Sequence, residues 1–315
     1  MSNHEPKSNK TTIGQTASAV GQAQDNETQI VQSLPTQDLS QDRILQGAQR
    51  VQFRDRNVPL LGGVAILAKI AQGKEYAVYY GIHFRHHKEL AVKAFRFDFG
   101  TSDPGNISLF FKKWQIAAKI RSPKLVSVKD VEEESGVFFV AMEFINGDSS
   151  SLVLREARTT GMTGLPEPIA LDISISATEG LSAAHAKNFV HNKIDVDNIL
   201  VPRLSLNGAE SKYDYKNSKL INMGSNEGQG EKVADVLCMC ETLCELLVGK
   251  KCPKGGTQSA DVYLKYIKDS RHDISDLTVT LIANCLGKVP GECCENASDL
   301  LTSLIECREN LENHV

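Results

Sequence analysis

The chain has 315 residues, of which 41% are hydrophobic, and this is enough to build one large domain or two small ones around a real core. The formal net charge of -4 gives no electrostatic reason to expect nucleic acid as a partner. No apolar run reaches the length of a membrane span, and the polar beginning is not typical of a signal peptide, so no membrane contact and a cytoplasmic protein are expected.

Residues 1–55 are predicted to be a disordered tail, because they are rich in Gln, Ser and Thr and poor in large apolar side chains. Two apolar pairs interrupt this composition, Ile30-Val31 and Ile44-Leu45, and they leave room for a short docking segment. A plain tail remains the prediction for this part of the chain.

The next part of the chain consists of β-branched and aromatic runs separated by polar turns, which is typical of antiparallel strands. Five strands are predicted, at residues 64–70, 76–82, 89–95, 125–128 and 137–144. A helix at residues 109–121 follows the third strand, and Pro123 ends it. The turn at residues 83–88 holds three histidines without a carboxylate or cysteine, so a solvated hairpin tip is favoured over a metal site.

The second half of the chain is predicted to be mainly helical. Residues 166–187 alternate like a strand, but their length, their proline start and their alanines favour a helix. Residues 204–218 form a polar insertion. Further helices are predicted at residues 236–248, closed by Gly249, at residues 275–286, stopped by Gly287, and at residues 297–312, capped by Asn296.

All eight cysteines lie between Cys238 and Cys307, which does not resemble a disulfide framework for the whole chain. Cys238, Cys240 and Cys244 are close in sequence, but they do not share one helix face and no CxxC pair supports them. They are predicted to be buried core thiols rather than metal ligands.

Residues 191–200, HNKIDVDNIL, resemble the catalytic loop of protein kinases, which reads H-R-D-x-K-x-x-N followed by two apolar residues. Four other segments match that family in the same order: the strand-three lysine motif at residues 90–93, the hinge at 140–144, the helix before the loop at 180–186 and the central helix of the large lobe at 235–249. The resemblance to bacterial-type Ser/Thr protein kinases covers about residues 58–310.

This resemblance implies an α+β, bilobal fold. The N-lobe, residues 56–145, would hold a five-stranded antiparallel sheet with one helix, and the C-lobe, residues 146–315, would be mainly helical.

The resemblance also implies roles for individual residues. The candidates for nucleotide binding are Gly73, Lys93, Met142 as gatekeeper, the backbone of Glu143 and Ile145 at the hinge, and Asn198. His191 and Asp235 are expected to be structural. Lys93 and Asn198 could equally be structural residues without a ligand, with Asn198 bonded to its own loop.

Four positions depart from the family pattern in their chemistry. Lys193 stands where the family has its catalytic aspartate, and a protonated ammonium cannot accept a proton. Asp195 stands at the place of the phosphate-facing lysine, and Asn222 at the place of the metal-binding aspartate. Lys113 aligns with the helix glutamate that should pair with Lys93, unless a slight turn of the helix brings Gln115 there as a weaker neutral partner.

Two loops depart as well. The loop that should cover the phosphates keeps Gly73 as its one glycine and places Glu75 and Tyr76 where phosphates would lie. Only residues 225–234 separate Gly224 from Asp235, too few for a full activation segment, and the family arginine that pairs with that segment aligns with Cys293.

The sequence therefore predicts a pseudokinase, a regulatory or scaffolding module without phosphoryl transfer, cofactor or metal, although weak ATP binding through the hinge backbone is left open. Its expected partner is a protein, and family analogy points to a related kinase or another signalling protein. The alternative is an enzyme with rearranged chemistry, in which Asp195 is the base and Lys193 contacts phosphate.

Overall fold

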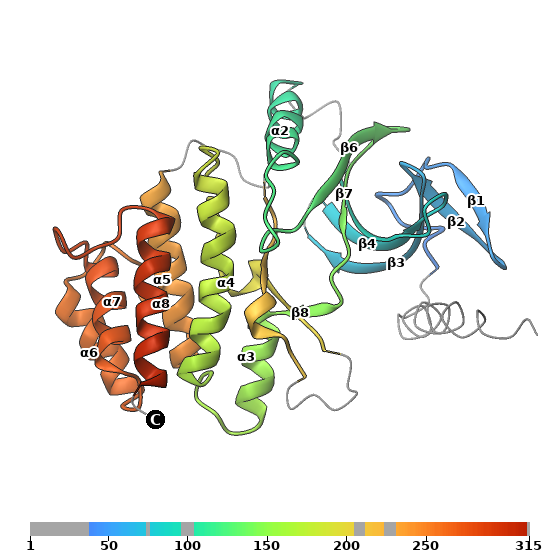
Figure 1. Cartoon of the computed structure of the whole chain (residues 1–315). Helices are drawn as coiled ribbons and strands as arrows, with labels where there is room; N and C mark the ends of the chain where they lie inside the picture. Colours follow the sequence, from blue (N-terminus) through green and yellow to red (C-terminus); the bar gives the residue numbers. More distant parts are fainter. Residues whose placement is uncertain (1–37, 74–75, 96–103, 205–211, 224–230, 314–315) are drawn as a thin grey trace, which may run out of the picture.

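The computed structural model describes residues 38–73, 76–95, 104–204, 212–223 and 231–313. They form two lobes, one built on a curled β-sheet and one built mainly of helices (Figure 1). This arrangement confirms the predicted bilobal α+β fold. None of the helices in the described ranges is both long and apolar enough to cross a membrane.

The sheet of the first lobe is antiparallel throughout, with strands in the order β1-β2-β3-β4-β5-β7-β6. Its strands are β1 (Arg50–Phe53), β2 (Arg56–Leu61), β3 (Val64–Gln72), β4 (Tyr76–His83), β5 (Glu89–Phe95), β6 (Val128–Glu134) and β7 (Val137–Glu143). The prediction of five strands was wrong, because the sheet also contains β1 and β2, which form a hairpin that was not predicted. The strand predicted at residues 125–128 also begins later, because Leu125 makes a bridge to Leu220 instead and β6 runs on to Glu134.

The segment before β1 packs on the sheet, so the prediction of a tail through residue 55 was wrong for residues 38–55. Leu39 and Leu45 are buried in an apolar cluster with side chains of β3, β4, β5 and β7. The Asp42 carboxylate binds Lys69 Nζ at 2.6 Å and accepts a hydrogen bond from the Tyr79 hydroxyl at 2.9 Å. Together these contacts fix a segment whose polar composition alone suggested disorder. Residues 1–37 lie outside the described residues.

One helix, α2 (Pro104–Ala117), accompanies this sheet and packs beside β6 (Figure 1). It ends four residues before the predicted boundary at Arg121, and two overlapping turns then carry the chain to Ile120. Trp114 is fully buried on its inner side.

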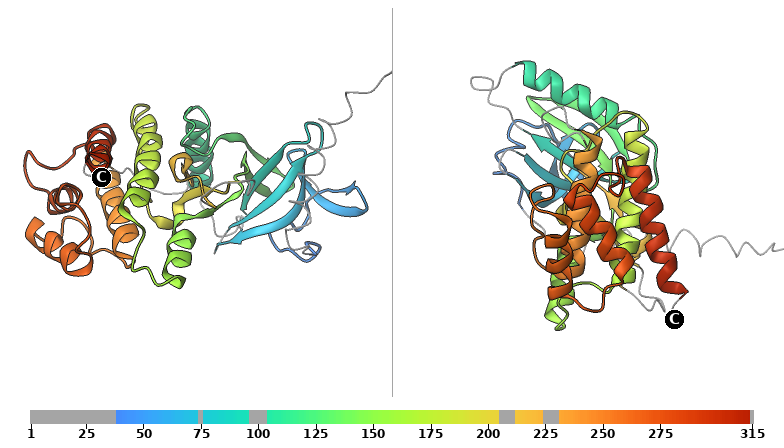
Figure 2. Two further views of the ribbon diagram at one scale, coloured as in Figure 1. Left: turned by 60° about the horizontal axis from the view of Figure 1, so that its bottom comes forward. Right: turned by 90° about the vertical axis from the view of Figure 1, so that its left-hand side faces the viewer.

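The second lobe is a helical bundle around α4. Residues 166–187, whose pattern fitted either a strand or a helix, contain this helix, as predicted. Figure 2 shows α4 and α8 running side by side, and their contacts agree. The helices are α3 (Ser150–Thr159), α4 (Glu167–His185), α5 (Lys232–Val248), α6 (Ala260–Ser270), α7 (Asp276–Gly287) and α8 (Ala297–Glu312). Helices α3 and α6 were not predicted.

The ends of these helices follow their capping residues. Gly249 ends α5 in a left-handed conformation with φ of 76°, as predicted, and a Cβ there would lie 1.6 Å from the carbonyl oxygen of Thr163. The Asn296 side chain accepts hydrogen bonds from the first turn of α8. Helix α7 differs from its prediction, because it includes Gly287 and ends at Lys288 in the left-handed conformation.

A small sheet with the order β10-β9-β8 lies between the lobes. It consists of β8 (Gly147–Ser149), β9 (Ile199–Pro202) and β10 (Lys219–Leu220), with the short helices η1 (Val196–Asn198) and η2 (Tyr215–Asn217) beside it. The predicted polar insertion, residues 204–218, is in part structured. Tyr213 is buried, and its hydroxyl lies within hydrogen-bond distance of the carboxylates of Asp148 and Glu156, at 2.7 and 2.9 Å. Residues 205–211 lie outside the described ranges.

Candidate functional site

The candidate site lies where β5 of the first lobe faces β10 and the following loop of the second. Lys93 of β5 is only 2% exposed, and its Nζ donates a hydrogen bond to Asn222 Oδ1 at 3.1 Å. The same Nζ lies 4.1 Å from the ring centroid of Tyr76, 5.5 Å from that of Phe95 and 6.0 Å from that of Trp114. These aromatic faces attract a cation, so Lys93 is enclosed by contacts that favour its charge.

Tyr76 begins β4 and lies next to Gly73, which follows β3. The Gly73 amide donates to the carbonyl oxygen of Tyr76 at 2.8 Å, and a Cβ on Gly73 would lie 2.3 Å from the Tyr76 ring. Gly73 therefore permits the Tyr76 ring to fold back over Lys93. Lys74 and Glu75 lie outside the described residues.

Burial and, to a smaller extent, the nearby charge of Lys193 lower the pKa of Lys93 from 10.5 to about 8. The aromatic rings and the Asn222 oxygen do not fully replace the water that the ammonium loses. Lys193, at the position expected for a catalytic aspartate, thus contributes repulsion to Lys93.

The α2 residue that the structure places against Lys93 is Trp114, which sequence reasoning missed. Gln115, the alternative partner, is exposed, so that suggestion was wrong. Lys113 is half-buried. The side chains of neighbouring residues in a helix point in directions that differ by about a quarter turn. A sequence alignment of this helix therefore could not decide whether Lys113, Trp114 or Gln115 points toward Lys93.

The loop at residues 191–200 is anchored by Asp235 of α5, which is fully buried. Its carboxylate accepts hydrogen bonds from the amides of His191 at 2.7 Å and Asn192 at 2.8 Å, and from His185 Nε2 at 2.9 Å. The predicted role of Asp235, tying loop amides to the central helix, matches these contacts.

His191 holds the other side of the loop. Its Nε2 lies 2.8 Å from the carbonyl oxygen of Ile221, and its Nδ1 accepts the Lys193 amide at 3.3 Å. A carbonyl can only accept, so Nε2 carries the proton and Nδ1 does not. Burial lowers the pKa of His191 and agrees with this neutral ring.

Asn222, Asn198 and Asp195 continue from Lys93 as a chain of hydrogen bonds. Asn222 Nδ2 donates to Asn198 Oδ1, and Asn198 Nδ2 donates to Asp195 Oδ1 at 2.7 Å and to the carbonyl oxygen of Lys193 at 3.1 Å. Asn222 Oδ1 and Asn198 Oδ1 are thus both hydrogen-bond acceptors within the protein. Asn222 adopts φ of 65°, a left-handed conformation that asparagine tolerates well.

The Asp195 carboxylate also caps η1, because its Oδ1 accepts the Asp197 amide at 3.0 Å. Burial and the charge of Asp197 raise the pKa of Asp195. A raised pKa suits a general base, but the cap and Asn198 already use this oxygen.

The hinge is bound to the second lobe through Glu143. Its carboxylate lies 2.8 and 2.9 Å from Lys219 Nζ of β10, and it accepts the Ser127 amide at 2.8 Å. Sequence reasoning did not identify Lys219. Met142 is buried in the core that spans both lobes, and Ile145 packs against it.

The cysteines are separate from this site. Cys240 and Cys244 are buried as predicted, whereas Cys238 is half-buried, and burial raises its pKa to about 11. Across the described ranges, no group of three or more His, Cys, Asp or Glu side chains is arranged to hold a metal ion. Of the predicted shortened activation segment, residues 225–234, residues 225–230 lie outside the described ranges. Cys293 is half-buried.

Comparison with known proteins gives a consistent match. The model of the protein kinase domain matches residues 64–226, a little more than half of the chain. The serine/threonine-protein kinase PrkC of Bacillus subtilis is 26% identical over 223 residues, which cover 66% of this chain and 33% of PrkC. A probable serine/threonine-protein kinase of Clostridium acetobutylicum is 22% identical over 78% of this chain and 40% of that protein.

The chain thus spans about a third to two fifths of the length of these relatives. Among solved structures, the PknI kinase domain of Mycobacterium tuberculosis aligns with a TM-score of 0.60 and 15% identity, over 79% of this chain and 97% of that one. This structural likeness supports the fold.

Proposed function

The chain belongs to the protein kinase domain family, and from this premise we propose that it is a binding module that does not transfer phosphate. The observation that carries this proposal is the enclosure of Lys93 by Asn222 and by the rings of Tyr76, Phe95 and Trp114. In a kinase this lysine must reach the phosphates of the nucleotide. Here its neighbours are the protein's own side chains, and the Tyr76 ring covers it.

The donor set does not fit a Mg²⁺–nucleotide complex. Mg²⁺ prefers carboxylate and phosphate oxygens in a nearly ideal octahedron, whereas Asn222 and Asn198 offer neutral amide oxygens. Each of those oxygens already accepts a hydrogen bond, from Lys93 and from Asn222 respectively. A metal would have to share these oxygens with their present donors, one of which is the Lys93 cation, without gaining a negative charge from them, so we derive no catalytic step through it.

The position of the base supports the same proposal. Lys193 offers a cation there, and Asp195 Oδ1 already accepts hydrogen bonds from Asn198 and from the Asp197 amide at the cap of η1. For the rearranged chemistry to operate, Asp195 would have to act through Oδ2 or release these donors. The raised pKa of Asp195 is the observation in favour of that alternative.

As a module of this kind, the chain would act by binding another protein. Family analogy suggests a related kinase or another signalling protein as the partner.

The test is a thermal-shift titration of the whole chain with ATP, alone and with Mg²⁺ or Mn²⁺, together with an autophosphorylation assay. We expect a shift in melting temperature below about 1 °C under every condition, because a ligand that does not bind the folded state cannot stabilise it. We also expect no incorporation of phosphate.

Each other outcome has a defined meaning. A metal-dependent shift with phosphate transfer overturns the proposal, and loss of that transfer in Asp195→Asn would then assign the base. A shift with ATP but no phosphate transfer leaves the binding module standing, and it overturns the inference that the side chains around Lys93 keep the nucleotide out. In that case Tyr76→Ala should enlarge the shift, and Tyr76→Phe, which keeps the ring, serves as its matched control.

A further inference from the structure

Strand β3 has an open edge along most of its length. On one side it pairs with β4 from Val64 to Gln72. On the other side β2 pairs with it only through Leu60 with Ala65 and Leu61 with Val64. Beyond Ala65, within the described part of the chain, no strand occupies this outer side. An open edge presents backbone donors and acceptors that can receive a further strand.

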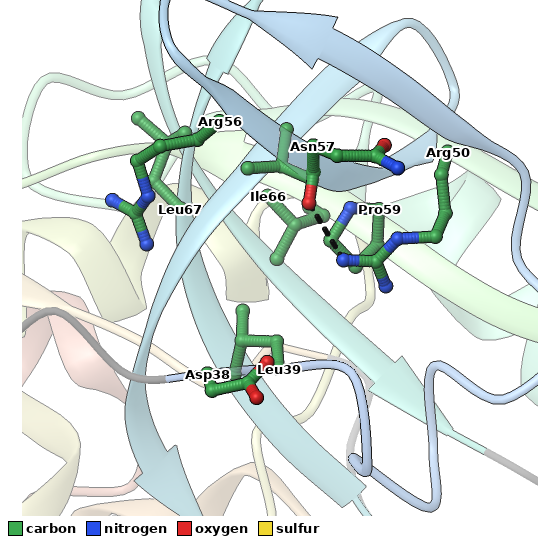
Figure 3. Close-up of a pocket in the computed structure, with 9 residues that line it drawn as sticks. Asp38, Leu39, Arg50, Arg56, Asn57, Pro59, Ile66 and Leu67 are labelled. Carbon is green, nitrogen blue, oxygen red and sulfur yellow. Dashed lines mark hydrogen bonds between the residues drawn. The ribbon is translucent and has the colours of Figure 1, made fainter.

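The β1–β2 hairpin leaves β3 at this point and opens a cavity of about 270 Å³ (Figure 3). Its apolar wall is formed by the buried side chains of Leu39, Val58, Ile66 and Leu67. The guanidinium groups of Arg50 and Arg56 lie at its rim. The cavity therefore combines apolar side chains with positive charge beside an unpaired strand.

We propose that residues 28–34 of this same chain add a strand to the open edge of β3 and place an apolar side chain in the cavity. The described chain begins at Asp38, which itself lines the cavity. The segment needed is thus joined to its site by residues 35–37 and has a high effective concentration there.

The chemistry of residues 28–34, TQIVQSL, fits the site. Thr28, Ile30 and Val31 favour extended backbone, and the stretch contains no proline or glycine. It is as long as the open edge, residues 66–72. Pro35 suits a turn between the added strand and Asp38.

The segment already docked next to it supports this choice of occupant. The Ile44-Leu45 pair lies in the same N-terminal part of the sequence, and Leu45 is buried on the sheet. Covering the edge would also protect the monomer from pairing through β3 with other chains.

Hydrogen–deuterium exchange of the whole chain, read by mass spectrometry, tests the proposal. The double variant Ile30→Asp/Val31→Asp removes the apolar contact, and we expect peptides that cover residues 66–72 to exchange roughly tenfold faster than in the wild type. Ile13→Asp/Val20→Asp is the matched control, with the same chemical change outside the proposed strand, and it should exchange like the wild type. Peptides covering β7 should be unchanged and report an intact fold.

Equal exchange at residues 66–72 in the wild type and in Ile30→Asp/Val31→Asp overturns the proposal. Dilution over about a hundredfold range separates the occupants, because protection by the chain's own segment is independent of concentration. Protection that disappears on dilution assigns the edge to a second copy and likewise overturns it. If residues 66–72 of the wild type are unprotected alone and become protected when an acidic peptide is added, the edge receives another protein, and the proposal is overturned.

Discussion

Lys93 is held in a buried place by an amide oxygen and by the faces of aromatic rings. An amide dipole and ring quadrupoles compensate a cation less completely than water does. The consequence is the low pKa of about 8. The ammonium is therefore a cost to the folded state at neutral pH, and this cost can be measured.

We predict that the stability of the wild type rises relative to Lys93→Met as the pH increases from about 8 to about 10.5. In this window the unfolded chain still holds the proton that folded Lys93 has lost, so increasing pH favours folding. Across this pH range, the difference in the free energy of unfolding between the wild type and Lys93→Met should change by about 3 kcal/mol. Urea denaturation at a series of pH values measures it.

Lys112→Met is the control, since Lys112 is an exposed lysine on the same helix as Trp114. A free-energy difference between wild type and Lys93→Met that is constant from pH 8 to pH 10.5 contradicts the prediction.

At the scale of elements, the long periodic helices and the central strands could be predicted from sequence, because their apolar pattern is strong. The β1–β2 hairpin could not, since its strands are short and Pro59 argues against an inner strand. Helix α3 is also short and depends on a cap, the Ser149 hydroxyl that accepts the Leu152 amide at 3.3 Å.

The candidate site was predictable to a similar degree. Lys93, Asn198, Asn222 and Asp195 were predicted from motifs and do meet in one chain of hydrogen bonds. Trp114 and Lys219 were missed, because their contacts depend on the rotation of a helix and on the meeting of two lobes, which no local pattern encodes.

Asp235 joins α5 to the loop at residues 191–200, and its removal should loosen both. We predict that Asp235→Ala lowers the free energy of unfolding by about 3–5 kcal/mol, because two backbone amides and His185 lose their buried acceptor. Chemical denaturation followed by circular dichroism measures the loss.

Asp261→Ala provides the comparison, since Asp261 is also in the first turn of a helix but is exposed. It should cost about 0.5 kcal/mol. An equally small loss for Asp235→Ala would show that the loop holds its shape without this anchor.

At the scale of the whole molecule, the two lobes share one apolar core that runs from Phe95 and Val140 into α4, α5 and the later helices. Backbone hydrogen bonds between Leu220 and the residues Lys124 and Val126 add a second connection. The ion pair of Glu143 and Lys219 is a third, and it lies at the hinge, where the lobes of a two-lobed protein would otherwise rotate.

We predict a favourable coupling of about 0.5–1.5 kcal/mol between Glu143 and Lys219 in a double-mutant cycle with Glu143→Gln and Lys219→Met. The pair is only 26% and 21% exposed, so solvent screens it incompletely. The pair of Glu156 and Lys212, 41% and 45% exposed, should couple by less than about 0.5 kcal/mol. Equal coupling in both pairs would contradict an added constraint at the hinge.

The chain of hydrogen bonds from Lys93 through Asn222 and Asn198 to Asp195 limits what a single substitution can change. Replacing Asn222 by aspartate would leave the Tyr76 ring over Lys93 and the Lys193 cation nearby. Opening Lys93 to a phosphate would need several substitutions at once, and each one alone would disturb a buried polar network. The side chains around Lys93 therefore have to be exchanged together, and variants that carry only one of the changes should be less stable than the wild type.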